Sequence, residues 1–165
     1  MNKDDINVRL YFKNRVETQA FIIRILNNAK LKVAEKSIVF SVTETPSLAH
    51  ITVGFYTNDD IVTKLGKKFD GLSAATTSGK HRKIYFNSYN FVNPPSHYPN
   101  PRTYRRYLVL HEFMHALGVN HVKSCTGCVC SIMTPQTKLI NCQANGGLLA
   151  SDRVLLDKHF NLRVN

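Results

Sequence analysis

The sequence predicts a mixed α+β fold in which strands come first and helices follow. Three segments rich in alternating apolar or β-forming residues lie in the first third of the chain, at residues 6–12, 38–42 and 51–55. The second half carries two helical segments, and one of them holds a cluster of histidines. This order favours a layered α+β domain with the histidine-bearing helix beneath a sheet.

The N-terminal part of the sequence supplies the predicted strands and one long helix. Apolar residues alternate over residues 6–12, as they do in a half-buried strand. Asn14 can cap a helix over residues 15–36, whose apolar side chains recur at helical spacing. The strands over 38–42 and 51–55 are rich in valine, isoleucine and phenylalanine, a composition that is typical of strands.

Shorter elements follow, separated by loops and proline-rich turns. They are a helix over residues 59–65, a loop over 71–79, a strand over 83–86 and an irregular connection over 93–101. The helix that carries the histidines begins near Arg102, and a last helix runs from Ser151 to Phe160. Ser151 is a favourable N-cap, and Asp152 lies in the first turn, where an acidic side chain stabilises the helix dipole. Residues 122–147 show few periodic signals.

Length and composition indicate one globular domain. The chain has 165 residues, enough for a single sizeable core, and its hydrophobic content of 43% is ordinary for a globular protein. No apolar run is long enough to span a membrane. Residues 1–5 hold no apolar segment of the signal-peptide type. Two alternatives therefore stay open: a chain with no encoded export signal, or a trimmed mature domain.

The chain is strongly basic, with a formal net charge of +11. Its basic residues are scattered along the chain, and local groups occur at Lys64, Lys67 and Lys68, at Lys80, His81, Arg82 and Lys83, and at Arg102, Arg105 and Arg106. Nucleic-acid binding would need a basic stripe with interleaved aromatic residues or a known module, and the sequence shows neither. The charge therefore predicts a soluble basic surface that attracts acidic substrates or anionic surfaces.

The most specific feature is the stretch from His111 to His121, which reads H-E-x-x-H-x-x-G-x-x-H. His111 and His115 are four residues apart, so on a helix they lie on one face and can reach the same metal ion. Gly118 allows the helix to end in a left-handed turn, which brings His121 back as a third ligand. Three protein ligands leave one tetrahedral position open for water, as in catalytic zinc sites.

Glu112 lies beside the predicted ligands without being one of them. Zinc lowers the pKa of water, and Glu112 can accept the proton that the water releases. The alternative is an ordinary helix that carries H-E-x-x-H by chance. Because the preceding run Tyr107–Leu110 is apolar, the helix is predicted to be buried, and such a polar cluster there would be costly without a metal. The isolated histidines, which we do not expect to bind metal, are His50, His81, His97 and His159.

The histidine motif resembles the zinc signature of the metzincin metallopeptidases. A second feature supports the resemblance, because Met133, within Ser131–Pro135, is similar to the Met-turn of that clan. The resemblance implies that Met133 forms an apolar floor beneath the metal without binding it. It also implies a mixed, twisted sheet above the active-site helix. Residues 1–165 would form one catalytic domain, with an N-terminal subdomain over about 1–118 and a small C-terminal subdomain over about 119–165.

Weaker similarities extend over most of the chain. Gly71–Ala74 and Ile84–Asn87 resemble the small-residue loop and the upper edge strand of metzincins, which grips an extended substrate through its backbone. The resemblance also implies that Thr134–Thr137 line the primed-side specificity pocket. Val122 and Pro135 differ from the residues that mark several subfamilies. The proline after the methionine is most similar to matrixins and adamalysins.

All four cysteines, Cys125, Cys128, Cys130 and Cys142, flank the predicted Met-turn. They allow three disulfide pairings. Adamalysins carry disulfides in a similar segment, whereas archaemetzincins carry a second, four-cysteine zinc site near there, and the spacing here matches neither pattern fully. Disulfides are slightly favoured, although a reducing compartment would favour zinc bound by thiolates.

These features together predict a zinc-dependent endopeptidase. The predicted ligands of one catalytic zinc are His111, His115 and His121, and Glu112 is the predicted general base. A second, structural zinc at the cysteines stays an open alternative. The expected substrate is a protein or peptide, and we expect a monomer with no nucleic-acid partner and no membrane span.

Two other functions stay open at this point. One is a zinc amidase that acts on non-protein amides such as peptidoglycan stems, and the other is a non-catalytic basic module that keeps a structural zinc. The compartment is open as well. The family resemblance slightly favours a secreted protein, whereas a native start at Met1 would indicate an intracellular one.

Overall fold

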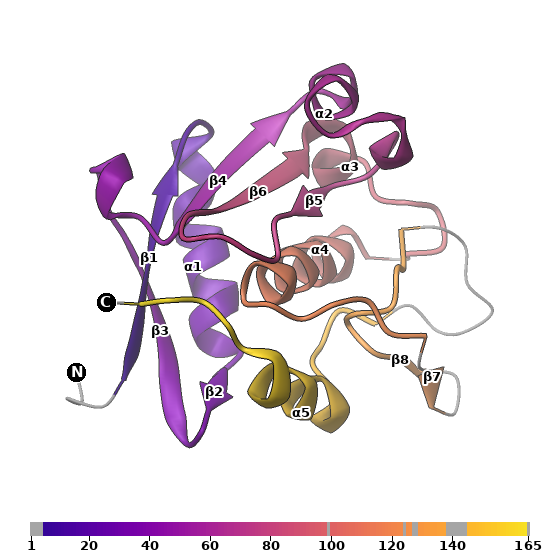
Figure 1. Ribbon diagram of the computed structural model, residues 1–165. Coiled ribbons are helices and arrows are strands. Elements are labelled where there is room, and N and C mark those ends of the chain that lie inside the picture. Colours follow the sequence, from indigo (N-terminus) through magenta and orange to yellow (C-terminus); the bar gives the residue numbers. More distant parts are fainter. Residues whose placement is uncertain (1–4, 99, 124, 127–128, 138–144, 165) are drawn as a thin grey trace.

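A six-stranded mixed sheet forms one layer of the molecule, and helices pack against it (Figure 1), so the predicted α+β fold is confirmed. The computed structural model describes residues 5–98, 100–123, 125–126, 129–137 and 145–164. The strands of the sheet are β1 (Ile6–Phe12), β2 (Lys32–Val33), β3 (Lys36–Val42), β4 (Ile51–Tyr56), β5 (Ala74–Ala75) and β6 (Arg82–Asn87). None of the helices formed by these described residues is long and apolar enough to cross a membrane.

The strand order is β2-β3-β1-β4-β6-β5. The four inner strands run parallel to one another, and the two short outer strands, β2 and β5, are antiparallel to their neighbours. Side chains from β1, β3, β4 and β6 enter one continuous hydrophobic core. Phe40 of β3 meets Phe113 of the histidine-bearing helix edge to face, with ring centroids 5.8 Å apart, so this helix lies directly against the sheet as expected.

The helices are α1 (Gln19–Asn28), α2 (Asn58–Leu65), α3 (Ser88–Val92), α4 (Pro101–Ala116) and α5 (Ala150–His159), with 3₁₀ turns at Val16–Thr18, Pro46–Leu48 and Lys67–Phe69. The histidine-bearing helix is α4, which runs beneath the sheet in Figure 1. Pro101 occupies its first turn, where no N–H is needed, and the Asn100 side chain accepts a hydrogen bond from the Arg102 N–H at 2.8 Å. Every residue from Tyr107 to Ala116 is buried, which holds this part of the helix rigid.

The predicted helix over residues 15–36 is wrong in length and in its cap. The α-helix is only α1, which ends at Asn28. The chain then forms the β2–β3 hairpin, and the turn of this hairpin is made by Ala34 and Glu35, both with positive φ. Asn14 does not cap the helix, because its side-chain amide pairs with both the N–H and the carbonyl of Phe55 in β4, each at 2.8 Å. A contact with a distant strand thus replaces the local one that the sequence predicted.

The predicted edge strand is also misplaced. Ile84–Asn87 belongs to β6, which lies inside the sheet between β4 and β5. The edge itself is β5, within the segment predicted as a loop over 71–79, and its alanines pair with Tyr85 and Ile84. A strand of two small residues has no alternating pattern, so sequence periodicity could not identify it.

The last helix begins slightly earlier than predicted. Its N-cap is Leu149, and Ser151 lies inside α5 rather than at its cap. The Asp152 carboxylate accepts a hydrogen bond from the Leu149 N–H at 2.8 Å and so satisfies this end of the helix. Leucine has no polar side-chain atom, so the sequence signal for a cap pointed to the neighbouring serine instead.

Candidate metal centre

Three histidine side chains meet at the end of α4. The Nε2 atom of His111 lies 3.2 Å from Nε2 of His115 and 3.1 Å from Nε2 of His121. The potential ligand atoms of the three residues all lie within 4.8 Å of one another. His111 and His115 are one helical turn apart on the same face, and the chain beyond the helix returns His121 to them. These three side chains can therefore hold one metal ion.

The turn that returns His121 depends on Gly118. This glycine has a φ of 112°, which L side chains rarely adopt. A Cβ there would lie 2.5 Å from the carbonyl oxygen of His159 and 2.6 Å from Oδ1 of Asn161. The backbone N–H of Asn161 donates to the Leu117 carbonyl at 3.1 Å. Close packing against the C-terminal tail therefore requires a glycine at this position.

Backbone carbonyls fix the tautomers of two of the three rings. Nδ1 of His111 lies 2.7 Å from the Ile132 carbonyl, and Nδ1 of His115 lies 2.7 Å from the Val119 carbonyl. Because a carbonyl only accepts, each Nδ1 carries the proton, and each Nε2 keeps its lone pair. Two lone pairs face each other at 3.2 Å and repel unless a cation lies between them. The donor set therefore fits a metal ion with imidazole ligands.

The electrostatic environment keeps these rings neutral. Burial, reinforced by the neighbouring His115, lowers the pKa of His111 to about 3. Burial, reinforced by His121, lowers the pKa of His115 to about 4, and burial also lowers the pKa of His121. A neutral imidazole is the form that binds metal, so no proton has to be displaced near neutral pH.

Glu112 is buried beside the histidines, with 3% of its surface exposed. Burial raises the pKa of its carboxyl to about 8. Its Oε2 atom has no hydrogen-bond partner among the described residues. An unpartnered carboxyl oxygen is costly inside a protein, and Glu112 is one of the residues that line the same cavity as the histidines. The carboxyl group therefore lies beside the histidines, at the wall of this cavity.

A cavity of about 380 Å³ opens over the three histidines. It is lined by His111, Glu112 and His115 of α4, by His121, by Ser73–Ala75 at the sheet edge, and by Pro135 and Thr137. In the segment Thr134–Thr137, which is predicted to line the specificity pocket, Thr134 and Gln136 are buried. Pro135 and Thr137 line the cavity. The cavity thus lies between the metal centre and the edge of the sheet.

Asp152 anchors the segment that carries Met133. Its carboxylate accepts hydrogen bonds from the Ser131 hydroxyl and from the Ile132 N–H, the latter at 3.2 Å. The Ser131 hydroxyl oxygen in turn accepts from the Met133 N–H at 3.0 Å. Met133 is fully buried in the hydrophobic core, and its role as a floor beneath a metal stays a prediction. Sequence reasoning identified Asp152 only as a first-turn acid and missed this anchoring.

One disulfide is present in the cysteine-rich segment. Cys125 and Cys130 are bonded and join the short antiparallel strands β7 (Cys125–Thr126) and β8 (Val129–Cys130). For the four cysteines together, the choice between disulfides and a second zinc stays a prediction. Cys128 and Cys142 lie outside the described residues.

The fold and the site together define the class of protein: a mixed α+β domain in which three histidines that can hold a metal ion lie beside a buried glutamate. The chain belongs to the DUF3152 family, which is described as a protein of unknown function and whose model matches residues 8–165. No curated protein sequence matches this chain.

Several solved structures are similar to this chain. The structure of myroilysin has a TM-score of 0.54 and 14% sequence identity, over 96% of this chain and 94% of that chain. A second myroilysin structure has a TM-score of 0.52 and 14% identity, over 95% of this chain and 86% of that chain. Archaemetzincin from Methanopyrus kandleri has a TM-score of 0.48 and 12% identity, over 96% and 97% of the two chains. At this identity the likeness to myroilysin shows a shared fold.

Proposed function

We propose that this protein is a zinc-dependent endopeptidase. One observation carries the proposal: two histidines with carbonyl-fixed tautomers direct bare Nε2 atoms at each other and at His121, beside an unpartnered buried Glu112. Imidazole is a common ligand of zinc, and three ligands leave a position for the reacting groups. The resemblance to metzincins supports the same conclusion.

His111, His115 and His121 would hold the zinc, and the chain's own groups would prepare the reaction. The bound zinc supplies Lewis acidity, which promotes attack of water on a carbonyl group. Glu112, which lines the same cavity as the histidines, accepts the water proton on its carboxylate. The same carboxyl then returns the proton to the leaving amine. Burial raises the pKa of this carboxyl to about 8 in the metal-free protein. The positive charge of a bound zinc ion would lower it again, which favours the ionised form that accepts a proton.

The edge strand β5 is the proposed support for the peptide substrate. β5 is the outermost strand of the described sheet, and its residues line the same cavity as the histidines. Ala74 and Ala75 have small side chains, which allow a second strand to approach. Ser73 accepts a hydrogen bond from the Asn87 N–H at 2.9 Å and holds this segment against β6. An extended peptide that pairs with β5 would lie across the metal centre.

The remaining assignments follow from the same proposal. Pro135 and Thr137 would shape the primed-side specificity pocket, and Met133 would form the floor of the site. The cavity is lined by residues from both sides of Gly118. This arrangement supports one catalytic domain with an N-terminal subdomain over about 1–118 and a C-terminal subdomain over about 119–165.

Glu112→Gln tests the proposal directly. The zinc-loaded variant should keep its metal and lose about 100-fold or more in kcat on a peptide library, because the proton acceptor is gone. Glu44→Gln is the matched control, since Glu44 is exposed and distant in sequence. Undiminished cleavage by Glu112→Gln would contradict the mechanism. Hydrolysis of peptidoglycan fragments, with no cleavage of peptides by the wild type, would indicate an amidase instead.

A further inference from the structure

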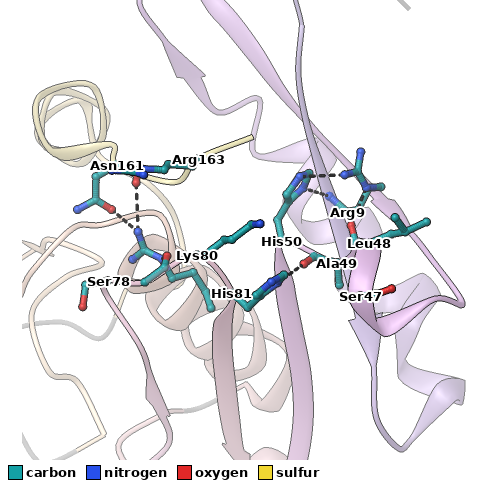
Figure 2. A pocket seen from close by; sticks show the side chains of 12 residues that line it. Arg9, Ser47, Leu48, Ala49, His50, Ser78, Lys80, His81, Asn161 and Arg163 are labelled. Atoms are coloured by element: carbon teal, nitrogen blue, oxygen red, sulfur yellow. Dashed lines mark hydrogen bonds between the residues drawn. The ribbon is translucent and has the colours of Figure 1, made fainter. Parts of the chain in front are cut away.

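A second cavity, of about 760 Å³, shares no lining residue with the cavity at the metal centre. It is lined by Arg9 of β1, by residues 47–50 just before β4, by residues 78–82 at the start of β6, and by Asn161 and Arg163 of the C-terminal tail (Figure 2). Every ionisable residue that lines it is basic, and these are Arg9, His50, Lys80, His81, Arg82 and Arg163. No acidic residue lines it within the part of the chain that the structure describes. The cavity is therefore a strongly cationic site.

Arg82 places an unsatisfied donor at this cavity. Only 2% of its surface is exposed. Its Nε donates to the Gly79 carbonyl at 2.8 Å, and its Nη2 donates to the carbonyl and to Oδ1 of Asn161 at 3.1 and 2.7 Å. Its Nη1 has no partner among the described residues. Buried donors on charged groups are costly when unpaired, and the residue that carries this one lines the cavity.

Arg9 and His50 present a second unsatisfied pair on another wall of the cavity. The backbone N–H of Arg9 donates to Nδ1 of His50 at 2.9 Å, so a neutral ring carries its proton on Nε2. This Nε2 lies 3.1 Å from Nη2 of Arg9, which is also a donor. Two donors thus face each other, and one acceptor atom beside them would satisfy both. Burial and, to a smaller extent, the charge of Arg9 lower the pKa of His50. The ring is therefore held neutral, with Nε2 as its donor.

The remaining basic side chains can close around a ligand. Figure 2 shows the Lys80 side chain extending toward His50, and both residues line the cavity. Lys80 and Arg163 are exposed, so their side chains can adjust to an anion at little cost. Nδ1 of His81 is held by the Ala49 carbonyl at 3.1 Å, which fixes the position of its ring.

We propose that this cavity binds the phosphate group of a small molecule. A phosphate has several acceptor oxygens, so it can satisfy donors on both walls at once, and arginine forks match its geometry. The cavity volume lies in the range of small-molecule sites and exceeds what a single inorganic ion fills. The ligand is therefore a phosphate ester rather than free phosphate. This site is independent of the proposed peptidase activity.

Calorimetric titration of the zinc-loaded protein with glycerol 3-phosphate and with inorganic phosphate, at low ionic strength, tests the proposal. We expect one saturable site with a lower Kd for glycerol 3-phosphate. The double variant Lys80→Gln/Arg163→Gln should bind at least about tenfold more weakly, because it loses two charge-assisted contacts. The control Lys32→Gln/Lys36→Gln removes the same charge from exposed residues of the β2–β3 hairpin and should change the Kd by less than about twofold.

Four results would overturn the proposal. Equal weakening in both double variants would indicate diffuse attraction to a basic surface. Binding that survives Lys80→Gln/Arg163→Gln but is lost in His111→Ala would place the phosphate at the metal centre. Absence of saturable binding by the wild type would exclude the site. Tighter binding of inorganic phosphate than of the ester would assign the cavity to the free anion and contradict the ester. Peptide cleavage by Lys80→Gln/Arg163→Gln reports separately on the metal centre.

Discussion

The backbone N–H of Ile132 donates to the buried carboxylate of Asp152 at 3.2 Å, while the carbonyl of the same Ile132 accepts from Nδ1 of His111 at 2.7 Å. One residue thus connects the first turn of α5 to a predicted metal ligand. His111 keeps its tautomer and its ring orientation only if Ile132 stays in place. The carboxylate therefore acts on the metal centre through the backbone, without touching it.

Replacing Asp152 with Asn should weaken both folding and metal binding. The amide keeps the size of the carboxylate but replaces one acceptor oxygen with a donor, which faces the N–H and O–H donors of Leu149, Ile132 and Ser131. We expect a loss of about 2 kcal/mol in the free energy of unfolding. The zinc Kd should rise by about tenfold or more, as for other outer partners of ligating histidines. Urea unfolding and competition with a chelator measure the two effects.

Glu44→Gln, which removes the carboxylate of an exposed residue, is the control. Asp152→Asn with the stability and zinc affinity of the wild type would show that the anchor is dispensable. A loss of stability with unchanged zinc affinity would separate the anchor from the metal centre.

Gly118→Ala should be far more harmful than the same change at another glycine of positive φ. The new Cβ would lie 2.5 Å from the His159 carbonyl oxygen, so the tail or the turn must move. At Gly66, with a φ of 97°, a new Cβ would have no heavy atom of the described residues within 4 Å beyond its chain neighbours. We expect a loss of about 1 kcal/mol for Gly66→Ala and about 3 kcal/mol for Gly118→Ala. Chemical unfolding of both variants measures the difference, and equal losses would show that close packing does not matter at Gly118.

Removing one predicted ligand should abolish tight zinc binding. His121→Ala leaves two imidazole ligands. Loss of a residue that only hydrogen-bonds to a ligand weakens metal binding by up to about 100-fold, so loss of a ligand itself should raise the zinc Kd by at least about 100-fold. His159→Ala is the control, because its side chain is exposed and lies outside the histidine cluster. Metal analysis after dialysis against a chelator gives the bound zinc per chain. Full zinc retention by His121→Ala would remove this residue from the ligand set.

Glu112 should make the zinc-free protein less stable as the pH rises. Its pKa is raised from 4.5 to about 8 in the folded state, so between these values the folded state holds more protons than the unfolded state. Stability is therefore present below pH 4.5 and is lost as the pH rises through 8. Glu112→Gln removes this loss. In zinc-free protein it should stabilise by about 4 kcal/mol at pH 8.5 and by little at pH 4.5, as urea unfolding at both pH values can show. A pH-independent difference would contradict the raised pKa.

The disulfide between Cys125 and Cys130 limits the number of free thiols. The denatured, unreduced protein should react with a thiol reagent at no more than two of its four cysteines. Cys125→Ser should release the Cys130 thiol. The number of reactive thiols per chain should therefore be no lower than in the wild type, although one cysteine has been removed. Four reactive thiols, together with two zinc ions per chain, would instead establish a zinc site at the cysteines.

Local patterns in the sequence predicted part of this molecule well. The inner strands and the helix that bears the histidines follow from alternation and helical spacing, which arise from short-range geometry. His111 and His115 share a face because four residues make about one turn, and Gly118 was identified from its place after the helix. The sequence could not predict which strand forms the edge, because β5 consists of two alanines without a pattern.

The sequence by itself determined which side chains could bind a metal and the layered α+β class, because both depend on spacing along one helix or one strand. Only the tertiary structure decided how these parts meet. Asn14 pairs with a strand 41 residues away instead of capping its helix, and Asp152 anchors Ile132 from a separate helix. Arg82 and Arg9 line one cationic cavity although they are 73 positions apart. Such contacts depend on how the whole chain packs, and no local pattern records them.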